Sequence, residues 1–64
     1  MDKLPGKIES YYFNYAKSNS IESFRLKHEL APTKNLLIVI MYNKDDKQIL
    51  RDRWLLKDGN WVKL

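Results

Sequence analysis

The most apolar part of the chain runs from Leu36 to Tyr42, where seven apolar or aromatic residues follow one another. A short continuous run of this kind is typical of a strand that is buried on both faces. Its β-branched residues, Ile38, Val39 and Ile40, also favour a strand. The sequence therefore predicts a central strand that presents apolar side chains in both directions.

Earlier in the chain, apolar residues recur with a different spacing. Between Lys7 and Lys17 they follow the i, i+3, i+4, i+7, i+8 pattern of one helical face, and they are Ile8, Tyr11, Tyr12, Tyr15 and Ala16. Pro5 suits the first turn of a helix, and the Ser18–Ser20 segment would end it. We expect a helix here, with Phe13 and Asn14 on its less buried side.

The segment 21–31 allows two interpretations. Phe24, Leu26, His28 and Leu30 alternate with charged residues, which is the period of a strand. A helix is the alternative, because several of these residues are good helix formers and Ala31-Pro32 is a plausible helix stop. On a helical wheel, however, Leu26 and Leu30 lie opposite Ile21 and Phe24. No single apolar stripe forms, and a strand is therefore favoured.

The rest of the chain reads as strands and turns. Asn43–Lys47 has turn composition, Gln48–Lys57 predicts a strand, and Asp58-Gly59 is a strong hairpin signal before a last strand over Asn60–Leu64. The predicted fold is α+β, one N-terminal helix packed on a small antiparallel three- to four-stranded β-meander, in a single domain of residues 1–64. The alternative fold has two helices followed by a hairpin or three-stranded sheet, as in a winged DNA-binding module.

The predicted hairpin can be paired residue by residue. With Asp45-Asp46 at the centre of the turn, one side of the sheet would carry Leu37, Val39, Met41, Leu50 and Trp54. The other side would carry Leu36, Ile38, Ile40, Tyr42, Ile49 and Leu55, and Tyr42 would lie opposite Ile49. One helix can cover one side, and nothing else in a chain of 64 residues is large enough to cover the other.

An uncovered apolar sheet face suggests a surface that binds another molecule. We expect a partner-binding surface with Arg51 and Arg53 at its margin and an apolar centre, made of Leu36, Ile38, Ile40, Tyr42 and Leu55. Its partner would be another protein or a second copy, and homodimerisation is the simplest form. A small regulator would fit this description. The competing interpretation is that Arg and Lys side chains lie over the apolar residues, or that a strongly twisted sheet hides them.

Charge adds a second hypothesis. Lysine and arginine total 12 against 8 aspartate and glutamate residues, a net charge of +4. Nucleic-acid binding through a basic sheet face is the alternative function, and its residues would be Arg25, Lys27, Arg51, Arg53 and Lys57. The competing interpretation is a solvated face with Glu29 and Asp52 nearby. The aromatic run from Tyr11 to Tyr15 could stack on bases, but its helical spacing favours a place in the core.

The sequence offers little for catalysis or cofactor binding. It has no cysteine, one histidine (His28) and only two glycines, so thiolate or histidine-cluster metal sites and Gly-rich phosphate loops are excluded. We expect a protein that is not an enzyme and uses neither a metal nor a small-molecule cofactor. The longest apolar run is seven residues, against the roughly 20 that a spanning helix needs. A soluble, cytoplasmic protein without a membrane partner is expected.

Overall fold

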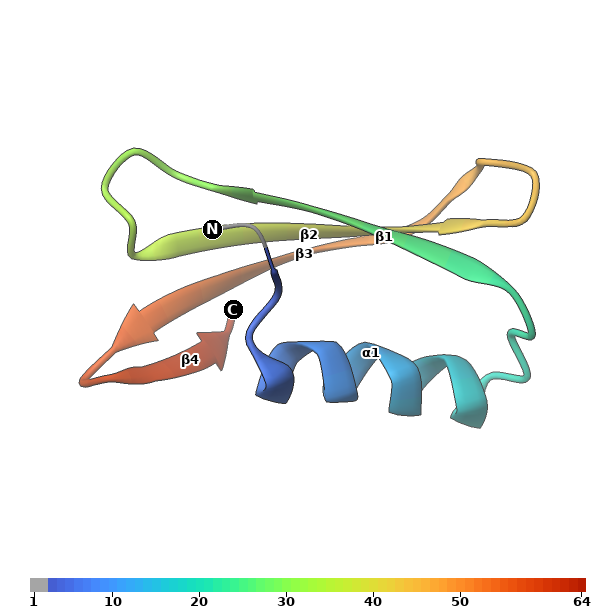
Figure 1. Cartoon of the computed structure of the whole chain (residues 1–64), viewed down its shortest axis with the longest axis horizontal. Helices are drawn as coiled ribbons and strands as arrows, with labels where there is room; N and C mark the ends of the chain where they lie inside the picture. Colours follow the sequence, from blue (N-terminus) through green and yellow to red (C-terminus); the bar gives the residue numbers. More distant parts are fainter. Residues whose placement is uncertain (1–2) are drawn as a thin grey trace.

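A computed structural model describes residues 3–64 as one helix and four strands (Figure 1). The elements, in chain order, are α1 (Gly6–Ser18), β1 (Phe24–Leu30), β2 (Leu36–Asn43), β3 (Gln48–Lys57) and β4 (Asn60–Lys63). Each strand pairs antiparallel with the next, and the order across the sheet is β1-β2-β3-β4. The predicted α+β fold is confirmed. The alternative with two helices is wrong, because the segment with period-two alternation is strand β1.

Helix α1 begins and ends where the sequence indicated. The carbonyl of Pro5 accepts hydrogen bonds from the backbone N–H groups of Ile8 and Glu9, each at 3.0 Å. After Ser18 the chain turns back, and the N–H of Ile21 donates to the carbonyl of Ala16 at 2.8 Å. This bond satisfies one of the carbonyls that every helix leaves unpaired at its C-terminus. The helix therefore stops within the segment predicted to end it.

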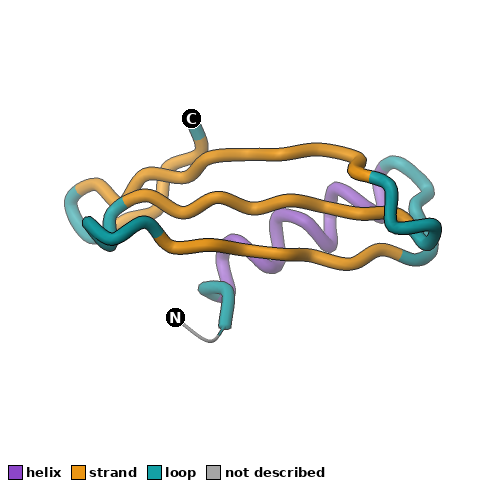
Figure 2. Tube along the Cα trace, turned by 90° about the horizontal axis from the view of Figure 1, so that it is seen from above, coloured by secondary structure: helices purple, strands orange, loops and turns teal. Residues whose placement is uncertain are grey.

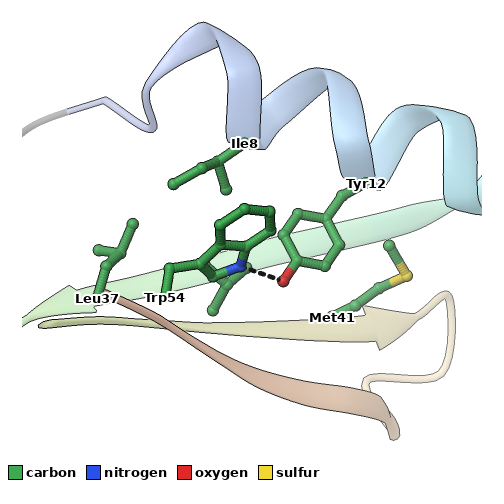
Figure 3. Packing of buried hydrophobic residues seen from close by; sticks show 6 residues of the cluster. Ile8, Tyr12, Leu37, Met41 and Trp54 are labelled. Carbon is green, nitrogen blue, oxygen red and sulfur yellow. Dashed lines mark hydrogen bonds between the residues drawn. The ribbon is translucent and has the colours of Figure 1, made fainter. Parts of the chain in front are cut away.

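The core lies between α1 and one face of the sheet (Figure 3). From the helix, Ile8, Tyr12 and Ala16 are buried at successive turns. From the sheet, the buried side chains are Leu37, Val39, Met41 and Trp54. These are four of the five residues predicted to share one side of the hairpin, and the fifth, Leu50, is partly buried against the same core. The predicted helix face is less uniform, because Tyr11 keeps 38% of its surface exposed.

The β2–β3 pairing follows the predicted register from Leu36 opposite Leu55 to Met41 opposite Leu50. The register then shifts between Met41 and Tyr42, so that Tyr42 lies opposite Gln48. The predicted pair of Tyr42 with Ile49 is therefore wrong. A bulge places an extra residue in one strand and re-aims the side chains beside it. Ile49 packs against the core instead of the opposite face.

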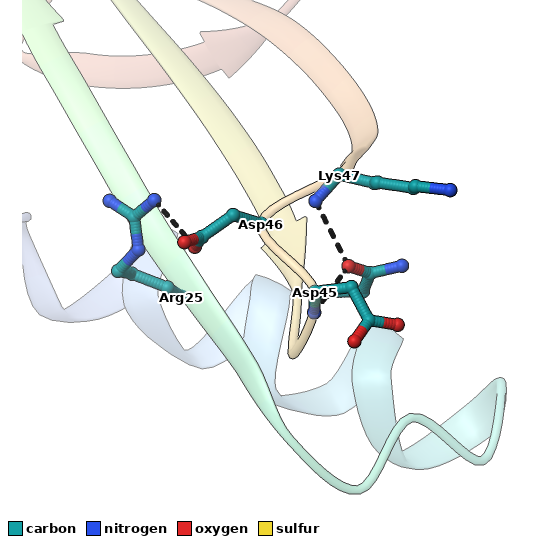
Figure 4. Close-up of polar contacts among 5 residues, drawn as sticks. Arg25, Asp45, Asp46 and Lys47 are labelled. Atoms are coloured by element: carbon teal, nitrogen blue, oxygen red, sulfur yellow. Dashed lines mark hydrogen bonds and ion pairs between the residues drawn. The ribbon is translucent and has the colours of Figure 1, made fainter.

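The turn between β2 and β3 explains this shift (Figure 4). The side chain of Asn43 accepts hydrogen bonds from the backbone N–H groups of Asp45 and Lys47, at 2.8 and 3.0 Å. Asp46 has a φ of 60°, the left-handed conformation that closes a three-residue hairpin loop. The loop is therefore one residue longer than the two-residue turn expected at Asp45-Asp46. That residue is absorbed as the bulge at the start of β3.

Candidate binding surface

The sheet has α1 on one face only, and its other face, here called the outer face, has no element over it in the described part of the chain (Figure 1). Figure 2 shows the strands side by side with α1 crossing behind them. Side chains of a strand alternate between the two faces, and Leu37, Val39 and Met41 point into the core. The outer face therefore receives the intervening residues of β2 and their neighbours in register. They include all five predicted apolar residues, Leu36, Ile38, Ile40, Tyr42 and Leu55, here called the outer stripe.

The predicted basic residues lie on both sides of this stripe. In one row of the sheet, Ile40 is opposite Lys27 of β1 and opposite Arg51 of β3. In the next row, Ile38 lies between Glu29 and Arg53. The structure thus brings the apolar and basic candidates of both functional hypotheses onto one face.

The ends of the stripe carry the remaining cations. Arg25 lies opposite Tyr42, and its guanidinium carbon is 4.7 Å from the centre of the Tyr42 ring. Arg25 also forms an ion pair with Asp46 at 3.0 Å (Figure 4). Lys57 is at the other end, two residues beyond Leu55 and opposite Asn60 of β4. On the outer face, the described strands therefore carry five cations and one carboxylate, Glu29.

The outer stripe is partly shielded by its own neighbours. All five of its residues are partly buried, and none reaches the exposure of a free surface side chain. Directly opposite residues on one sheet face have Cβ atoms about 5 Å apart, so the aliphatic parts of Lys and Arg can lie against Ile38 and Ile40. The outer stripe is therefore not a fully open apolar patch. The face is an apolar stripe between rows of long basic side chains.

Sequence reasoning missed the contribution of β4 to this face. Val62 lies opposite Leu55 and keeps 45% of its surface exposed, so it extends the apolar surface at one end. The Asp58-Gly59 hairpin signal could have given this pairing, because a two-residue turn fixes the register of the strands that it joins. Leu64, with 59% of its surface exposed, follows at the C-terminal end of β4.

Asp52 and His28 lie on the helix side of the sheet. Asp52 was expected near the basic face, but it lies opposite Val39 and accepts a hydrogen bond from the hydroxyl of Tyr12 at 2.8 Å. It also pairs with Lys63 at 3.9 Å. It therefore does not offset the outer-face cations. His28 is partly buried. It lies on the edge strand β1 and lines a groove between α1 and β1.

Other kinds of site find little support in the described residues. Within residues 3–64, no three His, Cys, Asp or Glu side chains come together in a way that could hold a metal ion. No helix in the same part of the chain has the length and apolar character needed to cross a bilayer. The two tryptophans belong to the core side, because Trp54 is buried and Trp61 packs against the core cluster.

Comparison with known proteins does not assign the surface. No family model matches the chain. No curated protein is similar to it. No solved structure shows a significant likeness to the fold.

Proposed function

We propose that this protein is a non-catalytic binding module that holds an acidic protein partner on its outer face. The observation that carries the proposal is the outer stripe, which runs along the centre of the sheet, has cations on both sides and has no element of the described chain above it. Apolar centres with arginine at their margins are typical of protein–protein interfaces. Partly buried Ile38 and Ile40 gain further burial when a partner displaces the remaining water.

Charge favours a different protein over a second copy on this face. Two copies meeting face to face would bring five cations against five, with Glu29 as the single strand carboxylate of each. Like charges brought together at an interface oppose association. An acidic partner would instead meet Lys27, Arg51 and Arg53, which form no ion pair within the described residues. The homodimer expected from the sequence is therefore not the form proposed for this face.

The test compares two new carboxylates. Ile38→Asp places one at the centre of the outer stripe, and Asn14→Asp places one on the exposed side of α1. The partner is captured from a lysate of the producing cells with the wild-type chain, identified and purified, and its affinity for each variant is measured by calorimetry. Ile38→Asp is expected to weaken binding at least about tenfold, or roughly 1.4 kcal/mol, and Asn14→Asp to leave it unchanged.

The folding of both variants is checked by circular dichroism and urea denaturation. Ile38→Asp should cost about 1 kcal/mol of folding free energy or less, the range of strand propensities at partly exposed positions. Equal affinity of the Ile38→Asp variant and the wild type for the purified partner would refute the proposal. A Val39→Asp variant serves as the contrasting case, since this buried core position cannot hold a charge and the chain should unfold.

A second function is favoured by one specific observation, the placement of Arg25, Lys27, Arg51, Arg53 and Lys57 on the same face. Such a face could bind the phosphates of a nucleic acid. The stripe between the cations is mostly aliphatic, however. Its single aromatic residue, Tyr42, already has Arg25 over its ring, and base stacking needs free aromatic faces. We therefore rank this function second.

Gel retardation at low salt with single- and double-stranded DNA and RNA tests the nucleic-acid function. If it holds, the affinity should fall steeply with salt, and Arg51→Gln or Arg53→Gln should each reduce the salt slope by about one. Absence of retardation at low salt would exclude nucleic-acid binding and leave the protein partner as the remaining proposal.

A further inference from the structure

Strand β1 forms one free edge of the sheet, and it is longer than strand β4 at the other edge. It has seven residues, whereas the opposite edge, β4, has four. The edge of a sheet presents backbone N–H and C=O groups that can pair with another strand. Proteins often keep such edges short, as β4 is, but β1 is long enough to pair with a full strand.

The hydrogen bonds of the sheet show which groups of β1 are free. The N–H of Ala31 donates to the carbonyl of Leu36 at 2.8 Å, so this pair is of the hydrogen-bonded type. Antiparallel pairs alternate between bonded and non-bonded types. The backbone groups of Arg25, Lys27 and Glu29 therefore face β2, and the backbone groups of Phe24, Leu26, His28 and Leu30 point away from the sheet. Within residues 3–64 these outward groups bond to no other element.

The sequence of β1 is complementary to itself when two copies run antiparallel about His28. Lys27 then lies opposite Glu29 of the second copy, twice by symmetry, and Leu26 lies opposite Leu30. Opposite charges at directly facing positions stabilise a pair of strands. Arg25 faces Ala31 in this register and keeps its ion pair with Asp46.

Neighbouring registers are less favourable. Centring the pair on Lys27 sets the two Lys27 side chains against each other. That register also sets Arg25 opposite Glu29, but there Arg25 would exchange its ion pair with Asp46 for the new one, so less is gained. Centring it on Leu26 sets Arg25 against Lys27. Centring it on Glu29 sets the two Glu29 carboxylates together. Like charges directly opposite one another are destabilising. The charge pattern of β1 thus selects the arrangement about His28.

A groove with both polar and apolar lining lies beside the same edge. It runs between α1 and β1 and has a volume of about 560 Å³. Phe13, Phe24 and Leu26 are its apolar part, and Glu9 and Glu22 also line it. Phe13 is 54% exposed and stacks edge-on against Phe24 with ring centres 5.3 Å apart. A second β1 strand at the edge would bring its own groove alongside, and Leu26 and Leu30 of each copy would shield one another.

From these observations we infer that two copies of the chain pair through their β1 strands, antiparallel and centred on His28, to form one continuous sheet of eight strands. The interface uses the edge of the sheet, so it leaves the outer stripe of each copy uncovered. It does engage Lys27 and Glu29 of the outer face, and Arg51 and Arg53 stay outside it. The two outer stripes then lie on the same side of the joined sheet. The inference stands on β1 alone and does not depend on the function proposed for the outer face.

Single cysteines test the register directly, because the wild-type chain contains none. In a hydrogen-bonded antiparallel pair, facing Cα atoms are about 5.5 Å apart, within the range of roughly 4.4–6.8 Å that a disulfide spans. His28→Cys should therefore give a disulfide-linked dimer under mild oxidation. In Lys27→Cys the two thiols would be diagonal neighbours, about 7–8 Å apart between Cα atoms, and should link much more slowly.

Lys27→Cys is also the control for random collision, since position 27 is exposed and position 28 is partly buried. Linkage of Lys27→Cys as fast as His28→Cys would overturn the inference. A wild-type chain that sediments as a monomer up to high micromolar concentration, with no linkage of His28→Cys, would overturn it as well.

A charge exchange tests the same pairs without a covalent bond. Lys27→Glu would set the new carboxylate against Glu29 of the second copy and should raise the dimer dissociation constant about tenfold. The double variant Lys27→Glu/Glu29→Lys restores opposite charges and should restore the dimer, measured by sedimentation velocity. A double variant that stays as weak as the single one would contradict the pairing. A dimer that Ile38→Asp disrupts and Lys27→Glu does not would belong to the outer face, and would also overturn it.

Discussion

At the scale of single residues, the hydroxyl of Tyr12 joins the helix to the sheet. It donates a hydrogen bond to the carboxylate of Asp52 at 2.8 Å. It also accepts a hydrogen bond from the indole N–H of Trp54 at 2.8 Å, which Figure 3 shows. Tyr12 is fully buried, and Trp54 keeps only 4% of its surface exposed. The apolar spacing of the sequence predicts that both residues enter the core, but it carries no sign that their polar atoms meet.

Replacing Tyr12 with phenylalanine tests this contact. Tyr12→Phe keeps the ring and leaves the buried Trp54 N–H without its partner, so the free energy of unfolding should fall by about 1–3 kcal/mol. Urea denaturation followed by tryptophan fluorescence measures the change. Tyr11→Phe is the matched control, because the Tyr11 hydroxyl makes no hydrogen bond within residues 3–64, and it should change stability by about 0.5 kcal/mol or less.

The same hydroxyl gives a dependence on alkaline pH. Burial raises the pKa of Tyr12 well above the ordinary tyrosine value, and the nearby Asp52 carboxylate raises it further, against the opposing hydrogen bond from Trp54. The unfolded chain therefore loses this proton at lower pH than the folded chain does. The stabilisation is complete below the unfolded pKa of about 10 and is lost as the pH rises from there toward the folded pKa.

Denaturation curves at a series of alkaline pH values check this prediction. The free energy of unfolding of the wild type should fall above pH ~10, the ordinary value for tyrosine, and part of that fall should be missing in Tyr12→Phe. Identical slopes for the two proteins would show that Tyr12 does not control the alkaline transition.

At the scale of elements, the spacing of apolar residues was enough to predict the helix and the strands. The details of the turns could not be predicted from it. The alternation of Phe24, Leu26, His28 and Leu30 identifies β1, and the 3.6-residue spacing of Ile8, Tyr12 and Ala16 identifies α1. Composition also indicates a turn between β2 and β3. It cannot show that the loop needs one more residue, because this depends on Asp46 adopting a left-handed backbone conformation. Because of this one extra loop residue, Ile49 was predicted on the outer side of the sheet although it packs against the core.

Much of the candidate surface could also be predicted from the pattern of residues along the strands. The outer stripe and its basic residues follow from alternation along the strands once the register is known. The groove between α1 and β1 does not, because it depends on where the helix lies across the sheet. The orientation of Asp52 toward Tyr12 depends on the same placement. Sequence pattern thus determines which residues share a sheet face, and helix docking determines what lies between the layers.

The β3–β4 turn gives a prediction at this scale. Asp58 and Gly59 both have positive φ, 52° and 79°, as the two central residues of a tight hairpin turn require. A Cβ atom at Gly59 would touch nothing within 4 Å, so Gly59→Ala should be limited by backbone strain alone, about 1–2 kcal/mol of lost stability.

Gly6→Ala provides the comparison for this turn variant. Gly6 is the first residue of α1, and a Cβ there also meets nothing within 4 Å, but its φ is not positive. Gly6→Ala should therefore leave stability unchanged or raise it by up to about 1 kcal/mol, since alanine restricts the unfolded chain. Thermal denaturation of both variants measures the contrast. A loss in Gly6→Ala as large as that in Gly59→Ala would contradict the role given to positive φ.

At the scale of the whole molecule, residues 3–64 form two layers, one helix and one sheet. A single helix has one apolar face to offer, and α1 uses it on the side of Leu37, Val39 and Met41. The other side of β2 is left to the long side chains of adjacent strands. A domain of this size buries only roughly 60% of its unfolded surface. Its two remaining apolar features, the outer stripe and the β1 edge, are where we place its contacts with other molecules.

The strand order also determines how this chain can reach its native state. Every strand pairs with the strand next to it in sequence, so each hairpin can form without waiting for a distant segment. Pairing strands that are neighbours in sequence requires the closure of only short loops, and small mixed domains fold faster than all-β domains, which take roughly milliseconds to seconds. Stopped-flow refolding should show one exponential phase that is complete within about a second. A populated intermediate would mean that the docking of α1, rather than sheet formation, limits the folding rate.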